Sequence, residues 1–163
     1  MKIKTKAEQR VEIAKDVIKY IKAEDIIAGS FYFKISSRKT YNGEQLQSVL
    51  PEIKRCEICA LGGMFYSYVK RHNNYEVDNG GIHNLTANSM RNAINMFSNK
   101  QLQLIESAYE QSDFVSSMEY ADSTIIRAID YREKNDLKFR ENHTKALIHI
   151  MKNIIANKGT FKP

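Results

Sequence analysis

The stretch that decides the fold is "CEICALGGMFYSYVK", which covers residues 56–70 and holds both cysteines of the chain. Its small side chains recur at steps of three and four residues, and so do its large apolar side chains on another side, as in an α-helix. Because a helix that is apolar nearly all round is a buried one, we predict that this segment forms the central helix of the core. The small residues are Cys56, Cys59, Ala60, Gly63 and Ser67, and the large ones are Ile58, Leu61, Phe65, Tyr68 and Val69.

Outward from this segment, most of the chain carries the spacing of amphipathic helices. The chain has 163 residues, of which 42% are hydrophobic and 27% charged, a composition typical of one folded domain. We therefore expect a mainly α fold, a single compact bundle-like domain over residues 1–163, with about six to seven helices and a minor β-hairpin. The helices are expected near 6–23, 46–53, 56–71, 90–97, from a cap at Ser98 or Asn99 to 109, 118–129 and 139–156, with a left-handed cap at Gly159.

One stretch has the alternation of a strand. Phe31, Phe33 and Ile35 alternate with Tyr32 and Lys34, which is the period of a half-buried strand. A lone strand leaves its backbone groups unpaired, so the sequence predicts a small hairpin around residues 31–36, with residues 75–77 as a candidate partner.

The compartment follows from charge and hydropathy. No apolar run reaches the length that a bilayer requires, and charged residues occur throughout residues 1–27, unlike the apolar centre of a signal peptide. We expect a cytoplasmic protein without membrane contact, whose two cysteines are reduced thiols.

The cysteines allow three interpretations. Cys56 and Cys59 precede His72 with the C-x2-C-x12-H spacing of a zinc finger, and His83 is the next available ligand. A C-x-x-C pair at a helix start is also typical of redox enzymes, although the βαβ pattern of a thioredoxin-like fold is absent. The third interpretation, in which small thiols let a neighbouring helix approach closely, fits the stripe of small residues best.

The region between His72 and His83 is the richest in polar loop signals. Asp78 lies between the two histidines, and such loops often carry functional groups. This arrangement keeps open a metal- or nucleotide-handling enzyme centred on Cys56, Cys59, His72, Asp78 and His83.

The net charge of +6 is concentrated at the two ends of the sequence. Residues 1–22 hold seven basic and three acidic residues, and residues 134–163 hold seven basic and two acidic residues. Helical spacing places Lys15, Lys19 and Lys22 on one side of the first helix. The same spacing gives the last helix a second basic side. Its members are Lys145, His149 and Lys152. If the two helices meet, their basic sides form a face for nucleic acid or another polyanion.

Three blocks of sequence resemble a group of small uncharacterised phage and prophage proteins. The blocks are "CEICALGGMFYSYVK", "QLQLIESAYE" at 101–110 and "MKNIIANKGTFKP" at 151–163. They resemble the C-x-x-C-A-x-G segment, the Q-L-x-x-I-E-x-A-[YF]-E helix and the final helix running into G-x-F of that group. The group has no established activity, so the resemblance implies a mobile-element source and assigns no catalytic residue.

These observations favour a non-enzymatic binding protein without a cofactor. We expect an accessory or host-interaction factor of a phage or mobile element, whose partner is a protein or a polyanion. The enzyme described above and a basic nucleic-acid-binding module remain as alternatives.

Overall fold

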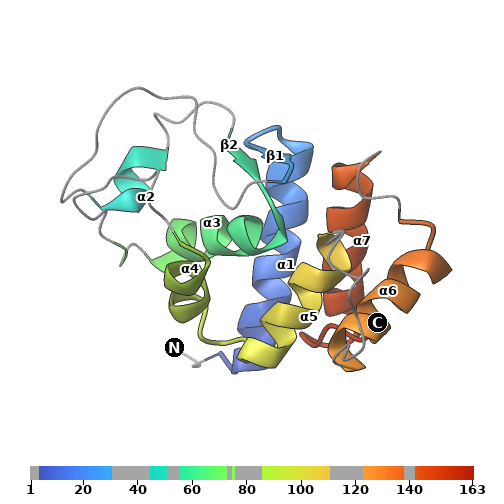
Figure 1. The fold of residues 1–163 in the computed structure, drawn as a ribbon. Helices are drawn as coiled ribbons and strands as arrows, with labels where there is room; N and C mark the ends of the chain where they lie inside the picture. Colours follow the sequence, from blue (N-terminus) through green and yellow to red (C-terminus); the bar gives the residue numbers. More distant parts are fainter. Residues whose placement is uncertain are drawn as a thin grey trace.

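The computed structural model describes residues 4–30, 45–50, 56–72, 75, 86–110, 123–137 and 142–163. Within these residues the chain forms seven helices and two short strands (Figure 1), so the mainly α fold class is confirmed. The helices are α1 (Lys6–Lys22), α2 (Leu46–Val49), α3 (Ala60–His72), α4 (Ala87–Ala93), α5 (Asn99–Tyr109), α6 (Ser123–Lys134) and α7 (His143–Ala156), and the strands are β1 (Ile26–Ala28) and β2 (Cys56–Ile58).

Helix α1 begins where its local sequence predicts. The Glu8 N–H donates to the Thr5 hydroxyl at 3.2 Å, and the Thr5 N–H donates to the Glu8 carboxylate at 2.7 Å. This reciprocal pair is a capping box, which satisfies two backbone donors that a helix start leaves free. The helix ends at Lys22, one residue from the predicted end, and buries Ile13, Ala14 and Val17.

The central segment differs from its prediction at its first residues. The predicted helix start at Cys56 is wrong, because residues 56–58 form β2 and α3 begins only at Ala60. Strand β1 pairs with β2 in parallel, with Ile26 opposite Cys56, and the Gly29 N–H extends the pairing to the Ile58 carbonyl at 2.8 Å. Pairing with a distant segment thus overrides the local helical spacing.

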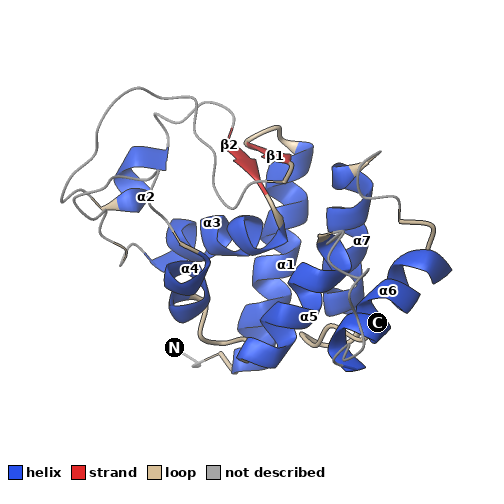
Figure 2. Ribbon diagram, viewed as in Figure 1, coloured by secondary structure: helices blue, strands red, loops and turns tan. Residues whose placement is uncertain are grey.

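The only sheet among the described residues is this parallel pair (Figure 2), which lies against the helices and is not a hairpin. A parallel pair requires a long crossover, here from Gly29 to Arg55. The hairpin strand predicted at 31–36 lies outside the described residues, as do residues 76 and 77 of its candidate partner. Tyr75 is described, and its ring packs edge-on against Phe65 at 5.0 Å between centroids.

Helix α3 occupies the centre of the core, as its composition predicts. Nine of its residues are buried, and it contacts α1, α4 and α5. A Cβ placed on Gly63 would lie 3.3 Å from the Ile58 side chain and 3.4 Å from Val17 of α1. Gly63 therefore lets α1 and β2 approach α3 closely, which is the packing reason that a glycine inside a helix requires.

The end of α7 lies against the start of α1. Gly159 has φ +88°, and a Cβ placed on it would lie 2.5 Å from the Ala7 carbonyl oxygen. The Gly159 N–H donates to the Ile154 carbonyl at 2.8 Å, which closes the helix end and confirms the left-handed cap predicted there. Since α1 and α7 pack along each other with opposite ends adjacent, the two terminal helices form an antiparallel pair.

At two further helix boundaries, one prediction from the local sequence is confirmed and one is wrong. Ser98 caps α5 through a bond from the Gln101 N–H at 3.3 Å, as predicted. Helix α4 ends at Ala93, although the apolar spacing predicted helix to residue 97, because Ile94 leaves the helical conformation with ψ 46°. The predicted start of the last helix at residue 139 lies outside the described residues.

Candidate functional site

The two cysteines are free thiols that lie wholly inside the core. Cys56 and Cys59 are both 0% exposed. Burial raises the pKa of each thiol to about 12, and the nearby carboxylate of Glu57 adds to the rise at Cys56. The thiolate is the form that attacks disulfides or binds metals, so at neutral pH these side chains are chemically quiet.

The structure does not bring His72 to the cysteines. Cys59 precedes the first residue of α3, and His72 is the last residue of this helix. A helix of this length spans about 18 Å, far beyond the reach of one metal ion. His83 and Asp78 lie outside the described residues, and the described residues contain no group of three potential metal ligands. Cys59 and His72 are therefore too far apart to bind one metal ion, and a site that includes His83 or Asp78 stays a prediction.

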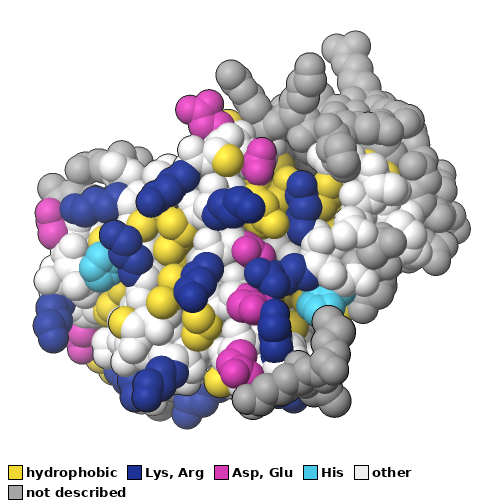
Figure 3. All heavy atoms as spheres, turned by 180° about the vertical axis from the view of Figure 1, so that it is seen from behind, with side chains coloured by type: hydrophobic (Ala, Val, Ile, Leu, Met, Phe, Trp, Pro, Cys, Tyr) yellow, Lys and Arg dark blue, Asp and Glu magenta, His cyan; other side chains and the backbone are white. Residues whose placement is uncertain are grey.

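The two helices that carry the predicted basic sides are neighbours in the fold. Helices α1 and α7 pack together, and Lys15, Lys19, Lys22, Lys145 and Lys152 are exposed. We call these five residues the lysine face. Figure 3 shows the molecule from behind, where Lys and Arg side chains spread over the surface with hydrophobic patches and a row of acidic side chains among them.

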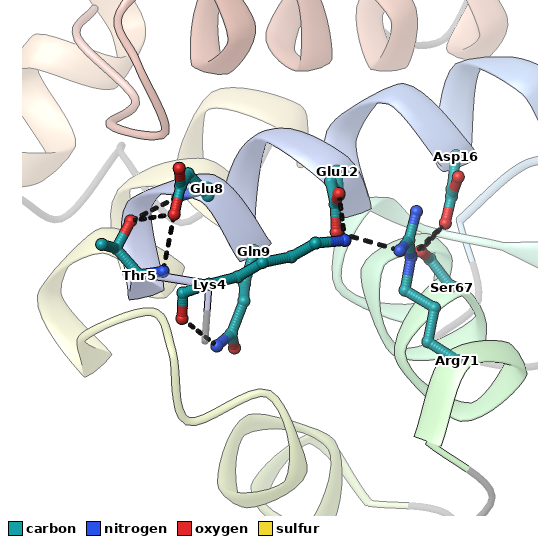
Figure 4. A network of polar contacts seen from close by, with 8 residues as sticks. All are labelled: Lys4, Thr5, Glu8, Gln9, Glu12, Asp16, Ser67 and Arg71. Carbon is teal, nitrogen blue, oxygen red and sulfur yellow. Dashed lines mark hydrogen bonds and ion pairs between the residues drawn. The ribbon is translucent and has the colours of Figure 1, made fainter. Parts of the chain in front are cut away.

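The acidic residues of α1 are engaged in a local network, which Figure 4 shows. Glu12 pairs with Lys4 at 2.6 Å and with Arg71 of α3 at 3.0 Å. Asp16 accepts from Arg71 Nε at 2.5 Å and from the Ser67 hydroxyl at 3.0 Å. Glu8 is held by Thr5 in the capping box. These contacts neutralise two of the three carboxylates and also attach α1 to α3.

The lysine face differs from this network. Among the described residues, none of its five lysines forms an ion pair, and the single side-chain hydrogen bond is that of Lys145 Nζ to the Asp136 carbonyl at 3.4 Å. From Asn142 to Pro163 the chain contains four lysines and no acidic residue. Positive charge that no described acid neutralises attracts anionic partners.

His149 does not belong to the lysine face as a cation. It is half-buried, and its Nδ1 lies 2.7 Å from the Tyr131 hydroxyl of α6. Burial lowers its pKa, and the charges of Lys152 and Lys145 lower it further. This lowered pKa favours the neutral ring, and a binding role for His149 beside these lysines stays a prediction.

A groove adjoins the lysine face between the start of α1 and the end of α7. Its volume is about 660 Å³, and Lys15 belongs both to the groove and to the lysine face. We call it the α1–α7 groove. Its aliphatic residues are Ala7, Val11 and Ile155, and its polar residues are Lys4, Thr5, Glu8, Glu12, Lys15 and Lys158.

Sequence reasoning missed this groove. Val11 shares the helical stripe of the core residues Ala14 and Val17, and only the structure shows that it is half-buried at the edge of that stripe. Lys158 follows the last helical residue, beyond the region where periodicity applies. One signal for the groove was present in the sequence. Val11 and Lys15 are four residues apart, and Ile155 and Lys158 are three apart, so each pair places an aliphatic and a basic side chain on the same side of a helix.

A second polar cluster surrounds α5 and serves the core. Glu106 is 6% exposed, and its carboxylate accepts two hydrogen bonds from Arg91, at 2.6 and 3.0 Å. The Tyr109 hydroxyl donates to the Gly29 carbonyl at 2.8 Å. Burial raises the pKa of Glu106 while Arg91 opposes the rise. These bonds tie α5 to α4 and to the end of β1, which is a structural role.

Comparison with known proteins gave no relative: no family model, curated protein or solved structure matches this chain. None of the helices in the described part of the chain has both the length and the apolar character needed to cross a membrane.

Proposed function

We propose that this protein is a non-enzymatic binding protein whose lysine face takes an acidic macromolecular partner. The observation that carries the proposal is the distribution of ion pairs. Glu12 and Asp16 of α1 are paired with Lys4 and Arg71, whereas the lysines of the lysine face pair with no described acid. The resemblance to phage and prophage proteins would make it an accessory or host-interaction factor of a mobile element.

The geometry of the terminal helices supports this function. Because α1 and α7 are antiparallel neighbours, the exposed lysines of the two ends of the chain lie on adjacent helices. Like charges on adjacent helices repel each other weakly in water, and the repulsion is relieved when an anion binds between them. The buried, protonated cysteines offer no support for catalysis centred on them.

The test is a titration with two anionic probes, a 20-base-pair DNA duplex and poly-L-glutamate, each at two salt concentrations. We expect binding that weakens steeply with salt, because each neutralised charge releases a counterion. Changing Lys15, Lys19 and Lys22 together to Gln should weaken binding at least about tenfold at low salt and reduce the salt slope by up to about 3.

A charge-matched control variant separates the lysine face from net charge. Lys100 of α5 and Arg127 and Lys134 of α6 are exposed and form no ion pair with a described residue. Changing these three to Gln lowers the net charge equally and should leave binding nearly unchanged. Equal losses in both triple variants, or no binding of either probe at low salt, would overturn the proposed function.

A further inference from the structure

We propose that the α1–α7 groove binds an apolar side chain from an acidic amphipathic helix of a partner protein. The inference rests on the proposed function and names the class of partner. It starts from the fact that the groove and the lysine face share Lys15, so that a partner held at Lys15 lies beside the groove.

The floor of the groove is aliphatic. Ala7 and Val11 are one helical turn apart on α1, and Ile155 faces them from α7. All three side chains are half-buried, so each leaves apolar surface in contact with water. Covering such surface with an aliphatic side chain is favourable, and a sugar–phosphate backbone offers no aliphatic side chain to do so.

The rim of the groove is cationic on both helices. Lys15 lies on the α1 side and Lys158 on the α7 side, and neither pairs with a described acid. The aliphatic part of a lysine side chain adds to the apolar surface of the groove, while its ammonium group stays in water. There the ammonium group can pair with a carboxylate that lies next to an apolar side chain of the partner. An apolar residue with acidic neighbours matches this arrangement.

One carboxylate in the groove disfavours a nucleic acid. Glu12 is neutralised by Lys4 and Arg71, but Glu8 makes its bonds to Thr5 and forms no ion pair with a described cation. A nucleic acid carries a negative charge at every phosphate, so a nucleic acid in the groove would place a phosphate near the Glu8 carboxylate, which repels it. A partner helix can carry its acidic residues on one side only and so avoid this repulsion.

The apolar strip is long enough for a helix. Ile18 lies two turns along α1 from Val11, and Ile148 lies two turns along α7 from Ile155, so each pair shares a helix side. Both are half-buried. On each helix this apolar side therefore extends about 10 Å beyond the groove, which suits a partner helix with apolar residues at i and i+7.

The experiment uses two 16-residue peptides of identical Glu and Leu composition. In one, leucines at helical spacing form a single face, and in the other, the leucines are scrambled so that no face forms. We expect the amphipathic peptide to bind the whole protein about tenfold tighter than the scrambled one. Amide shifts in ¹⁵N spectra should then change most at Ala7, Val11 and Ile155, a readout on the unaltered protein.

Two variants sharpen the result. Val11→Gln should remove the preference for the amphipathic peptide, while Ile126→Gln on α6, where the side chain is 47% exposed, should keep it. The melting temperature of each variant shows whether it is folded. If Val11→Gln does not fold, Val11→Ala replaces it in the same binding measurement.

The outcomes separate this inference from the proposed function. Equal affinity for the two peptides, with salt-dependent binding of both, overturns the groove inference and leaves the lysine face intact. Shifts in the groove caused by the DNA duplex overturn it in favour of a nucleic acid. Failure of both peptides, poly-L-glutamate and DNA to bind overturns the lysine face itself.

Discussion

The cysteine segment and the lysine face differ in whether the fold buries their reactive side chains or leaves them exposed to water. The cysteines carry the more specific motif, yet both are 0% exposed with pKa values near 12. The lysines belong to no motif, yet all five are exposed on two helices that come from opposite ends of the sequence and pack together. Burial and pairing therefore indicate the site better than residue type does, because both determine whether a group can meet a partner.

The largest effect should come from filling the space beside the cysteine segment. Gly63→Leu should lower the free energy of unfolding by about 3 kcal/mol, since its Cβ alone would lie 3.3 Å from Ile58 and 3.4 Å from Val17. Cys56→Ala should lower it by only about 1 kcal/mol, because it removes a single sulfur atom from the same core. Denaturant unfolding measures both, and equal losses would contradict the tight approach at Gly63.

The next effect should come from separating the two helices of the lysine face. Gly159→Ala places a methyl group 2.5 Å from the Ala7 carbonyl in a backbone conformation, φ +88°, that only glycine adopts easily. We expect a loss of about 1–2 kcal/mol in the free energy of unfolding, together with weaker binding of poly-L-glutamate. Unchanged stability would show that the end of α7 does not need its close contact with α1.

Local signals and non-local pairing explain what the sequence could predict. Helix α1 and the Ser98 cap were predictable because the capping side chains and the apolar spacing lie within a few residues of each other. Strand β1 was not, since its three residues pair with a segment 30 positions away. The α1–α7 groove was also beyond reach, because it exists only where the first turn of α1 meets the end of α7.

A smaller effect should follow from removing Arg71, the cation of α3 that pairs with two carboxylates of α1. Arg71→Gln breaks its pairs with Glu12 and Asp16, in which the Arg71 side chain is 31% exposed, and should lower the free energy of unfolding by about 0.5–1 kcal/mol. It should also weaken poly-L-glutamate binding, because Asp16 then loses its only ion pair with a described residue while Glu12 keeps Lys4. Arg127→Gln is the control, because it removes an exposed charge that pairs with no described residue. If the two variants bind alike, the network has no influence on the lysine face.

The smallest effect should appear at His149, which links the lysine face to pH. Burial, and then the charges of Lys152 and Lys145, lower the pKa of His149 in the folded protein. At pH values between this lowered pKa and the ordinary value of about 6.5, the unfolded chain therefore binds more protons than the folded protein. The stabilisation by neutral His149 is present above pH 6.5 and decreases as the pH falls below it. The Tyr131 hydroxyl, 2.7 Å from Nδ1, can donate only to the neutral ring.

Polyanion binding should change in the opposite direction over the same pH range. A protonated His149 adds a positive charge beside Lys145 and Lys152, so lowering the pH from 7.5 to 5.5 should strengthen binding of the DNA duplex while stability falls. In His149→Gln both trends should be reduced, whereas the Lys100, Arg127 and Lys134 triple variant should retain them. Parallel unfolding and binding measurements at the two pH values decide the matter. If the pH dependence of His149→Gln equals that of the unaltered protein, another group titrates, and the neutral histidine is not the feature that limits the charge of the lysine face.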